Sequence, residues 1–194
     1  LLSGLDVKVG KLRAFGTTLD QAAVQLTRKP SAWALQLDSQ QVKGNASLPD
    51  AKAAPMVINL QTVRLPAPDP TVLADENSPD PLASVDPKKI PALDITINQL
   101  YQGNDLVGAW SLKVRPTAKG IALNSLDMGL KGILLQGSGG WEGAPGASTS
   151  WYKGRISGKN LADVLKGWGF APSVTSQEFH MDVDGRWPGS PAWL

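Results

Sequence analysis

The residues best suited to acid–base or metal chemistry stand together near the C-terminal end of the sequence. His180 is the single histidine, and Asp182 and Asp184 follow it at alternate positions. A histidine near a Ser or Cys nucleophile motif would indicate hydrolysis, but no such motif accompanies it. Two carboxylates on one strand face could bind Ca²⁺, which prefers several oxygen ligands, but no third acid and no calcium loop is present beside them. We therefore expect these residues on the solvated face of a strand.

Two further patterns could bind anions. Residues 137–143 are rich in glycine, but they lack the spacing of a nucleotide-binding loop and lead into a turn and a strand rather than a helix. Trp151, Lys153, Arg155 and Lys159 would project from one face of a strand, where they could form an anion or headgroup patch. Basic groups on a strand are more often its solvated side. We expect no catalytic residue, no metal and no cofactor.

Composition narrows the choice of function further. The 194 residues include 19 basic and 17 acidic side chains, so the chain lacks the strong positive field that attracts nucleic acids. It has no cysteine, which excludes thiolate catalysis and thiolate metal sites. No run approaches the roughly 18 apolar residues that a membrane-spanning helix needs.

The sequence begins at Leu1 without a methionine and its last residues, 191–194, suggest the start of another strand. We expect a piece of a longer protein.

The elements that position these residues come from an internal repeat. Leu5-Asp6 recurs as Leu93-Asp94, which gives a period of roughly 88 residues. A recurring unit usually stacks on its neighbour and buries a continuous apolar face. The later matches are Val7/Val9 with Ile95/Ile97, Leu12 with Leu100, Gly16-x-x-Leu19 with Gly103-x-x-Leu106, Leu26-x-x-x-Pro30 with Leu112-x-x-x-Pro116, and Trp33-x-Leu35 with Ile121-x-Leu123.

Alternation within each copy predicts short antiparallel strands. Apolar and polar residues alternate with a period of two from Leu5 to Val9, as in a half-buried strand. The phase slips between Val9 and Leu12, and again between Ile97 and Leu100, which indicates a β-bulge or a strand end. Further strands are expected around 22–26, 33–37, 56–65, 108–114, 121–123, 133–141, 150–157 and 179–187.

Two segments interrupt this pattern. Residues 66–91 contain seven prolines and five acidic residues, a composition that favours a mobile surface loop between a first repeat, 1–65, and a second, 92–194. A short helix is expected near 160–169, with Asn160 as N-cap and Gly169 as terminator. Its apolar stripe at i, i+3, i+4 and i+7 should cover one end or the mouth of the sheet. The stripe consists of Leu161, Val164, Leu165 and Trp168.

The alternation also predicts which side chains share one face of the sheet. Trp33, Trp110 and Trp187 occupy inward positions, so they belong to a core rather than to a sugar-binding platform. The expected lining of the apolar face comprises Val7, Val9, Leu26, Leu35, Ile58, Leu60, Ile95, Ile97, Leu112, Val114, Ile121, Leu123, Ile133, Leu135, Phe179, Met181 and Val183.

These features together resemble a known family. The Leu-Asp strand start, the Gly-Gly-Trp strand end, the helix from Asn160 to Phe170 and the Arg186-Trp-Pro-Gly-Ser-Pro191 segment are similar to the AsmA-like C-terminal region of YhdP proteins, related to TamB. Residues 160–191 carry the most specific part. The resemblance implies a mainly β fold, a long curled sheet built from a repeated antiparallel meander. It also implies an inner-membrane-anchored protein that spans the periplasm of Gram-negative bacteria and carries phospholipid toward the outer membrane.

Three functions follow as hypotheses. The first is a lipid-transfer segment, because a sheet with one apolar face must pack that face or present it to an apolar ligand, and a single short helix cannot cover it. The second is a scaffold or protein-interaction domain of the cell envelope with a closed, dry core. The third is a carbohydrate-active enzyme, which would need paired carboxylates at a cleft. The expected partners of the first are acyl chains and, through the full-length protein, the inner and outer membranes.

Overall fold

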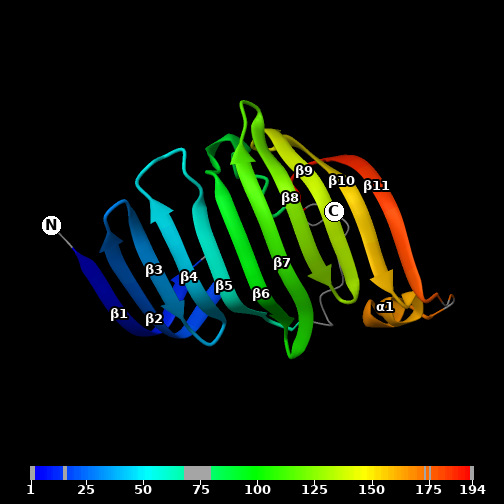
Figure 1. Ribbon diagram of the computed structural model, residues 1–194, viewed down its shortest axis with the longest axis horizontal. Coiled ribbons are helices and arrows are strands. Elements are labelled where there is room, and N and C mark those ends of the chain that lie inside the picture. The colour runs from blue at the N-terminus through cyan, green and yellow to red at the C-terminus, as the bar shows by residue number, and fades with distance from the viewer. Residues whose placement is uncertain (1–2, 15–16, 68–79, 173, 175, 193–194) are drawn as a thin grey trace.

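The computed structural model describes residues 3–14, 17–67, 80–172, 174 and 176–192. It contains one sheet of eleven strands that lie side by side in chain order, with a short α-helix at the strand ends (Figure 1). The strands are β1 (Gly4–Ala14), β2 (Thr17–Lys29), β3 (Ala32–Asp38), β4 (Val42–Pro49), β5 (Met56–Leu65), β6 (Leu93–Gln102), β7 (Asp105–Pro116), β8 (Gly120–Leu130), β9 (Ile133–Ala144), β10 (Ala147–Lys159) and β11 (Glu178–Pro188). The helices are the 3-10 helix η1 (Pro87–Lys89) and α1 (Leu161–Gly167).

This architecture confirms the predicted fold class. The sheet is curled and open, because β1 and β11 each have only one neighbour among the described strands (Figure 1). All neighbours are antiparallel except β5 and β6, which are parallel. The two copies of the repeat begin with β1 and β6 and meet at that parallel pair. No helix in the described ranges is both long enough and apolar enough to cross a membrane.

The phase slip predicted in each copy has a structural counterpart. In the second copy the β6–β7 register shifts between Ile97 and Leu100, which is a bulge. In the first copy Gly10 and Gln21 drop out of the β1–β2 pairing without a change of register, and Gln21 takes a positive φ of 52°. The irregularity lets the apolar side chain of Leu100 remain buried although its spacing from Ile97 is three.

Close approaches between strands depend on glycine. Gly137 of β9 and Gly154 of β10 lie opposite each other. A Cβ atom on Gly154 would lie 2.8 Å from Gly137 Cα and closer still to the main-chain oxygen of Gln136. Only glycine permits this contact between backbones, and glycine pairs of this kind are a common way to bend a sheet.

The connection between β5 and β6 contains the segment 66–91 that composition predicts to be a mobile loop. Parallel strands need a crossover from one end of the sheet to the other. Residues 68–79 of this crossover lie outside the described residues, but residues 80–91 are held in place and include η1. Asp86 Oδ1 accepts a hydrogen bond from Lys88 N–H at 3.0 Å and so caps η1, whose Pro87 is fully buried.

Helix α1 forms at the predicted place, but its ends and its buried side differ in detail. Asn160 is at the N-cap with φ 49°, yet its side chain donates to Asp163 Oδ2 instead of capping a backbone N–H. Gly169, with φ 83°, ends the helix, and Phe170 N–H donates to the Leu165 carbonyl as in a Schellman motif. Ala162 and Val164 are buried, whereas Trp168 is 43% exposed. The apolar stripe therefore packs through its first turn and not through Trp168.

The predicted strand at the C-terminal end is absent from residues 191 and 192, which form a turn. Residues 193 and 194 lie outside the described residues. The chain leaves β11 through Gly189, whose φ is 92°, and turns back toward the sheet, where Gly189 N–H donates to the Ser148 carbonyl.

Candidate functional site

The strand register places the predicted apolar residues of every repeat on one face of the sheet, which we call the apolar face. Partners in neighbouring strands point to the same side. Leu26 is opposite Leu35, Ile58 is opposite Ile95, and Ile95 is opposite Leu112. The chain of pairings continues through β8–β11, and it joins all seventeen residues: Val7, Val9, Leu26, Leu35, Ile58, Leu60, Ile95, Ile97, Leu112, Val114, Ile121, Leu123, Ile133, Leu135, Phe179, Met181 and Val183.

This face is only half covered by the chain itself. Of the seventeen side chains Val114 is buried, at 6% exposure, and Met181 is exposed, at 54%, while the other fifteen lie between these classes. Within the described ranges, the elements that pack on the sheet are η1 against β8 and β9, and α1 against β10. A closed sheet sandwich would bury most of these side chains. The described residues therefore place no second layer on most of the width of the apolar face.

The crossover covers one part of the apolar face. We call residues 80–92 the strap. Trp141 of β9 lies on the apolar face beneath it and is 3% exposed, and its indole N–H has no hydrogen-bond partner among the described residues. An unpaired buried N–H costs about 1–3 kcal/mol. Because no hydrogen bond compensates this cost, the burial of the Trp141 ring must come from apolar packing.

A hydrogen-bonded anchor fixes the strap. The Asp80 carboxylate accepts from Ser190 N–H at 2.7 Å and from Ser190 Oγ–H at 2.6 Å. The Ala83 carbonyl accepts from Gly146 N–H at 2.8 Å. Ser150, which lies on the apolar face, donates its hydroxyl to the Gly189 carbonyl at 2.9 Å. These bonds tie the strap to the β9–β10 turn and to the segment after β11.

The pKa of Asp80 lies below its ordinary value, although two kinds of effect act on it in opposite directions. Desolvation raises the pKa of this carboxyl. Hydrogen bonds from the Ser190 hydroxyl and from the N–H groups of Leu82 and Ser190 favour the charged form and together outweigh it. The carboxylate is therefore ionised at neutral pH and able to accept all three bonds.

Tryptophan side chains follow the predicted division between the faces. Trp33, Trp110 and Trp187 lie on the apolar face, as the alternation predicted. Trp110 donates its indole N–H to the Gly129 carbonyl at 3.1 Å, and Trp187 donates to the Ser190 carbonyl at 3.0 Å. Trp151 lies on the opposite face, over Gly140.

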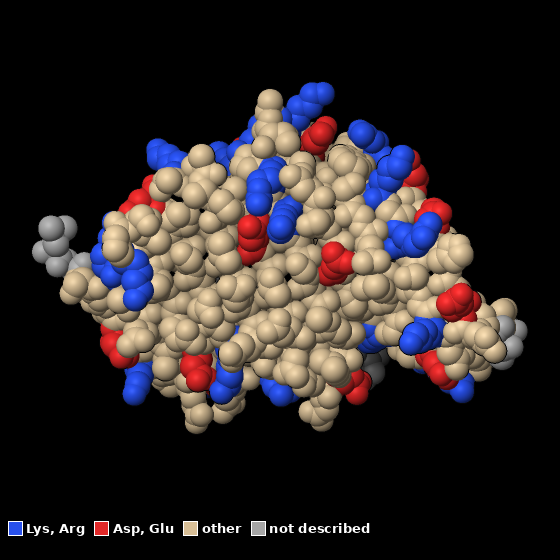
Figure 2. All heavy atoms as spheres, in the orientation of Figure 1, with Lys and Arg blue, Asp and Glu red and all other residues tan. Residues whose placement is uncertain are grey.

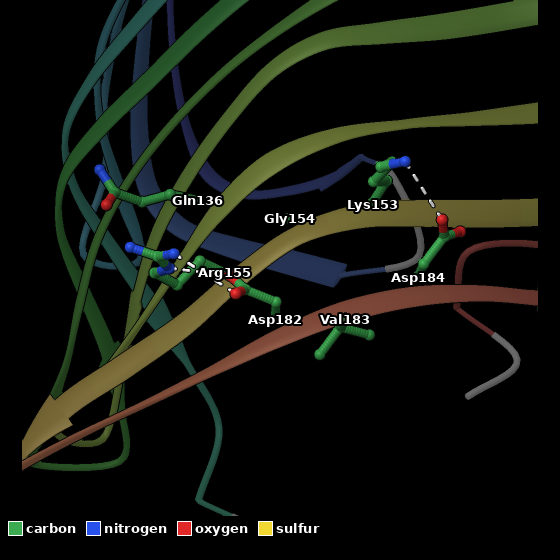
Figure 3. Close-up of a pocket in the computed structure, with 7 residues that line it drawn as sticks. All are labelled: Gln136, Lys153, Gly154, Arg155, Asp182, Val183 and Asp184. Carbon is green, nitrogen blue, oxygen red and sulfur yellow. Dashed lines mark hydrogen bonds and ion pairs between the residues drawn. The ribbon is translucent and has the colours of Figure 1, made fainter.

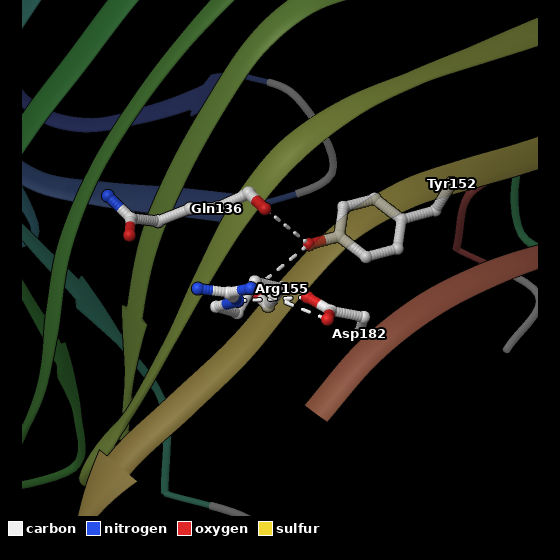
Figure 4. Close-up of polar contacts among 4 residues, drawn as sticks. All are labelled: Gln136, Tyr152, Arg155 and Asp182. Atoms are coloured by element: carbon white, nitrogen blue, oxygen red, sulfur yellow. Dashed lines mark hydrogen bonds and ion pairs between the residues drawn. The ribbon is translucent and has the colours of Figure 1, made fainter. Parts of the chain in front are cut away.

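Tyr152 is a feature of the apolar face that the sequence reasoning missed. It is paired with Gly139 and Gly185, so it shares the face of Trp141 and Trp187. Its hydroxyl lies 3.0 Å from the Gln136 carbonyl, to which it donates (Figure 4). Desolvation raises the pKa of this phenol. The ring lies over glycines 137 and 154, and glycines opposite an aromatic residue on neighbouring strands are the signal that could have predicted it.

The opposite face of the sheet is polar. Figure 2 views this face, where charged side chains are scattered over β6–β11 and gather along the strand ends. The four basic-patch residues predicted on β10 do lie on this face, but Lys153 pairs with Asp184 at 3.3 Å and Arg155 pairs with Asp182 at 2.9 Å. Hydrogen bonding to Arg155 lowers the pKa of Asp182. These pairs leave little free positive charge on the patch.

His180, Asp182 and Asp184, which were considered for acid–base or metal chemistry, also lie on the polar face. A depression of about 570 Å³ lies beside the two ion pairs and is bordered by Gln136 and Val183 (Figure 3). His180 is exposed nearby. In the part of the chain that the structure describes, no three His, Asp or Glu residues come together as metal ligands. The charges that border this depression are paired with each other, Lys153 with Asp184 and Arg155 with Asp182.

Comparison with known proteins bears on this arrangement. No curated protein and no solved structure matches the chain. The family model described as YhdP protein matches residues 3–194, which includes all eleven strands, the strap and α1. Because this match covers nearly the whole length, the chain belongs to the YhdP protein family.

Proposed function

We propose that this chain is a segment of a lipid-transfer protein in which the apolar face carries the acyl chains of phospholipids. The observation that carries the proposal is the row of apolar side chains that runs across the sheet, mostly half exposed, on which the described residues place no second layer over most of its width. Membership of the YhdP family supports it, because YhdP proteins resemble lipid-transfer proteins of the AsmA and TamB type.

The physical basis is the transfer of hydrocarbon out of water. Each buried CH₂ group contributes about 0.8 kcal/mol, so a single acyl chain laid on the face gains several kcal/mol. The gain arises at every strand that offers apolar surface, because it requires no specific polar contact. A lipid can therefore shift along the sheet without a specific binding step. Such transfer needs no nucleophile, metal or cofactor, and we propose that the segment is not an enzyme.

The proposal extends to the location of the whole protein. A face of this kind is useful where lipid must cross an aqueous space between two membranes. We propose that the chain works in the periplasm of Gram-negative bacteria as part of an inner-membrane-anchored protein, with the inner and outer membranes as its partners. The YhdP family is consistent with an envelope protein.

A matched pair of variants on β8 tests the proposal. Leu123→Asp places a carboxylate on the apolar face, and Ser125→Asp places one on the polar face, because Leu123 pairs with Val114 whereas Ser125 pairs with Lys113. Chain purified from bacteria is analysed by native mass spectrometry and lipid extraction. Acyl lipid should accompany the wild type and the Ser125 variant and be lost from the folded Leu123 variant. The full-length parent with each change should differ in the same way in restoring outer-membrane integrity.

Two results would contradict the proposal. One is a wild-type chain that carries no acyl lipid under any condition of purification. The other is a folded Leu123→Asp variant that carries lipid as the wild type does.

A protein-interaction domain is the second candidate, and it is favoured by the unpaired edges of β1 and β11 among the described strands. Such edges can add a strand from a partner. Capture of a partner by a chain without lipid would support it.

A further inference from the structure

A second depression on the polar face lies near the strand ends at the top of Figure 1, and its volume is about 310 Å³. Glu142, Thr149 and Arg186 line it from β9, β10 and β11. Their strand pairing puts them on the polar face with Trp151, which is the cross-strand partner of Arg186. The depression therefore opens away from the apolar face and from any lipid bound there.

Three cations converge on this depression without an ion-pair partner among the described residues. Lys88 lines it from η1, Lys119 from the β7–β8 turn and Arg186 from β11. All three are exposed, and none lies within ion-pair distance of a described carboxylate. Among the described lining residues Glu142 is the one carboxylate. Like charges that converge without a partner repel each other, and a bound anionic group relieves that repulsion.

Hydrogen bonds hold the backbone that carries these groups. Gly143 N–H donates to the Lys119 carbonyl at 3.0 Å, which ties β9 to the β7–β8 turn. The Thr117 hydroxyl oxygen accepts from Lys119 N–H at 3.3 Å, and Asp86 Oδ1 accepts from Lys88 N–H at 3.0 Å. The cations are thus presented from fixed backbone positions, which reduces the ordering that a ligand would have to impose.

The Trp151 ring gives the same surface an apolar plane. The indole lies over Gly140, because a Cβ atom on that glycine would lie 2.8 Å from Cε2 of the ring and closer still to Nε1. The side chain is half-exposed and is paired directly with Arg186 on β11. Its indole N–H donates to no described residue and, unlike that of Trp141, is not buried. An aromatic surface and a free donor therefore lie beside the cations.

We infer that the depression and the Trp151 ring form a binding site for an acidic saccharide, a sugar that carries a carboxylate. A pyranose ring has an apolar face of C–H groups that can lie on the indole. Arg186 can bind both carboxylate oxygens with its guanidinium fork, and the two lysines supply point charges. Glu142 and the Thr149 hydroxyl can form hydrogen bonds with the sugar hydroxyls. The inference concerns the polar face and does not rest on lipid transfer.

Glu142 distinguishes a sugar from a simple anion. Its carboxylate repels phosphate or an acidic peptide, but it accepts hydrogen bonds from hydroxyl groups. A simple anion would also gain nothing from an aromatic plane. The lining has one carboxylate among its described residues, whereas glycoside hydrolysis generally uses a pair, so the site is suited to binding rather than to cleavage.

The first test measures binding by calorimetry and removes the charge. The probes are trigalacturonic acid, a hyaluronan tetrasaccharide and sialyllactose, with lactose as the neutral counterpart of the last. Lys119→Gln/Arg186→Gln should weaken binding of the acidic sugars about tenfold through the loss of two exposed charge-assisted contacts. The control, Lys29→Gln/Lys113→Gln, removes two exposed cations that do not line the depression and should change binding by less than about twofold. Equal losses in the two variants would overturn the site.

The second test removes the aromatic plane. Trp151→Leu keeps apolar bulk over Gly140 but has no flat ring, and it should weaken binding about fivefold because apolar ring surface is lost. Trp151→Phe should restore part of the affinity. Trp168→Leu changes an exposed tryptophan on another part of the molecule and should leave binding unchanged. Circular dichroism confirms that each variant is folded, and wild-type affinity in a folded Trp151→Leu variant would contradict the proposal.

The third test uses the sign of one change. Glu142→Gln should weaken binding of the acidic sugars several-fold, because a hydrogen bond to a charged acceptor outweighs an exposed charge repulsion. The same variant should bind inorganic phosphate more tightly. Tighter binding of both would assign the depression to simple anions, and hexaglutamate that binds as tightly as the sugars would assign it to an acidic protein. Both outcomes overturn the inference, as does a wild type that binds none of the three acidic sugars more tightly than lactose.

Discussion

A carboxylate introduced on the apolar face measures how open that face is. Ile97 and Leu126 both lie on it, on β6 and β8, and both have apolar neighbours in the adjacent strands. They differ in burial, because Leu126 is 8% exposed whereas Ile97 is intermediate between buried and exposed. The substitutions Ile97→Asp and Leu126→Asp therefore place the same group in two environments on one surface.

The expected costs follow from burial. Truncation of a buried Leu costs about 2–5 kcal/mol, and an unpaired buried carboxylate adds several more. The cost of Leu126→Asp should thus approach the whole free energy of unfolding of a domain, about 5–15 kcal/mol. This variant should be largely unfolded at neutral pH. At Ile97 only part of the side chain's transfer energy is lost and the carboxylate keeps part of its hydration. Ile97→Asp should cost about 2–3 kcal/mol and leave a folded chain.

Urea unfolding followed by tryptophan fluorescence gives both values, and Ile97→Ala and Leu126→Ala serve as controls that remove the side chain without adding charge. The pH dependence provides a second check. A buried Asp has a raised folded-state pKa, so the folded state binds the proton more tightly than the unfolded state does. Stability then falls as pH rises from the unfolded value, about 3.9, and Leu126→Asp should be more stable at pH 4 than at pH 7. Ile97→Asp should show a smaller change. Equal costs at the two positions would refute an open face at Ile97.

Three other predictions concern the elements that shape the sheet. Gly154→Ala should destabilise the chain by about 1–3 kcal/mol because its Cβ meets the β9 backbone, while Gly185→Ala, with no atom within 4 Å, should be nearly neutral in the same urea titration. Val164→Ala should cost about 1–2 kcal/mol and Trp168→Ala less than about 1 kcal/mol in thermal unfolding, because only Val164 is buried against the sheet. The lowered pKa of Asp80 means that its contribution to stability is present above the unfolded value and is lost as pH falls through the folded value. The protection factors of strap amides, which are exchange rates relative to an unstructured peptide at the same pH, should therefore fall at acid pH in the wild type and be low at all pH values in Asp80→Ala.

The faces of the strands could be predicted from the sequence because alternation with a period of two is a local property. Even the break at Ile97–Leu100 was visible, since the repeat shows it twice. The end of α1 was visible for the same reason, because Gly169 is the residue that a left-handed C′ position favours. Each of these features is decided by neighbours within a few positions of the chain.

The strap could not be predicted, because the interactions that order it are distant in sequence. Asp80 and Ser190 are separated by 110 positions, and neither stands in a motif that points to the other. The proline-rich and acidic composition of residues 66–91 indicates a segment that builds no core of its own. It cannot indicate that Pro87 packs on a sheet formed elsewhere. The exposure of Trp168 was missed in a similar way, since helical periodicity gives a face but not the depth at which each residue on it is buried.

The position of the strap limits how a lipid could lie on the sheet. Neighbouring strands are about 4.8 Å apart, so the ten steps from β1 to β11 span about 48 Å of apolar face. Over β1–β7 the described residues place no second layer on that face, so an acyl chain there could use its whole width. Above Trp141 the strap already occupies the face, and hydrocarbon must pass beside it, nearer the end of the strands where α1 lies. A lipid that moves across β8–β11 is therefore confined to part of the strand length there. This follows only if the strap stays in place, so a chain in which Asp80→Ala releases the strap should admit hydrocarbon to Trp141, which a brominated acyl chain would report by quenching its fluorescence.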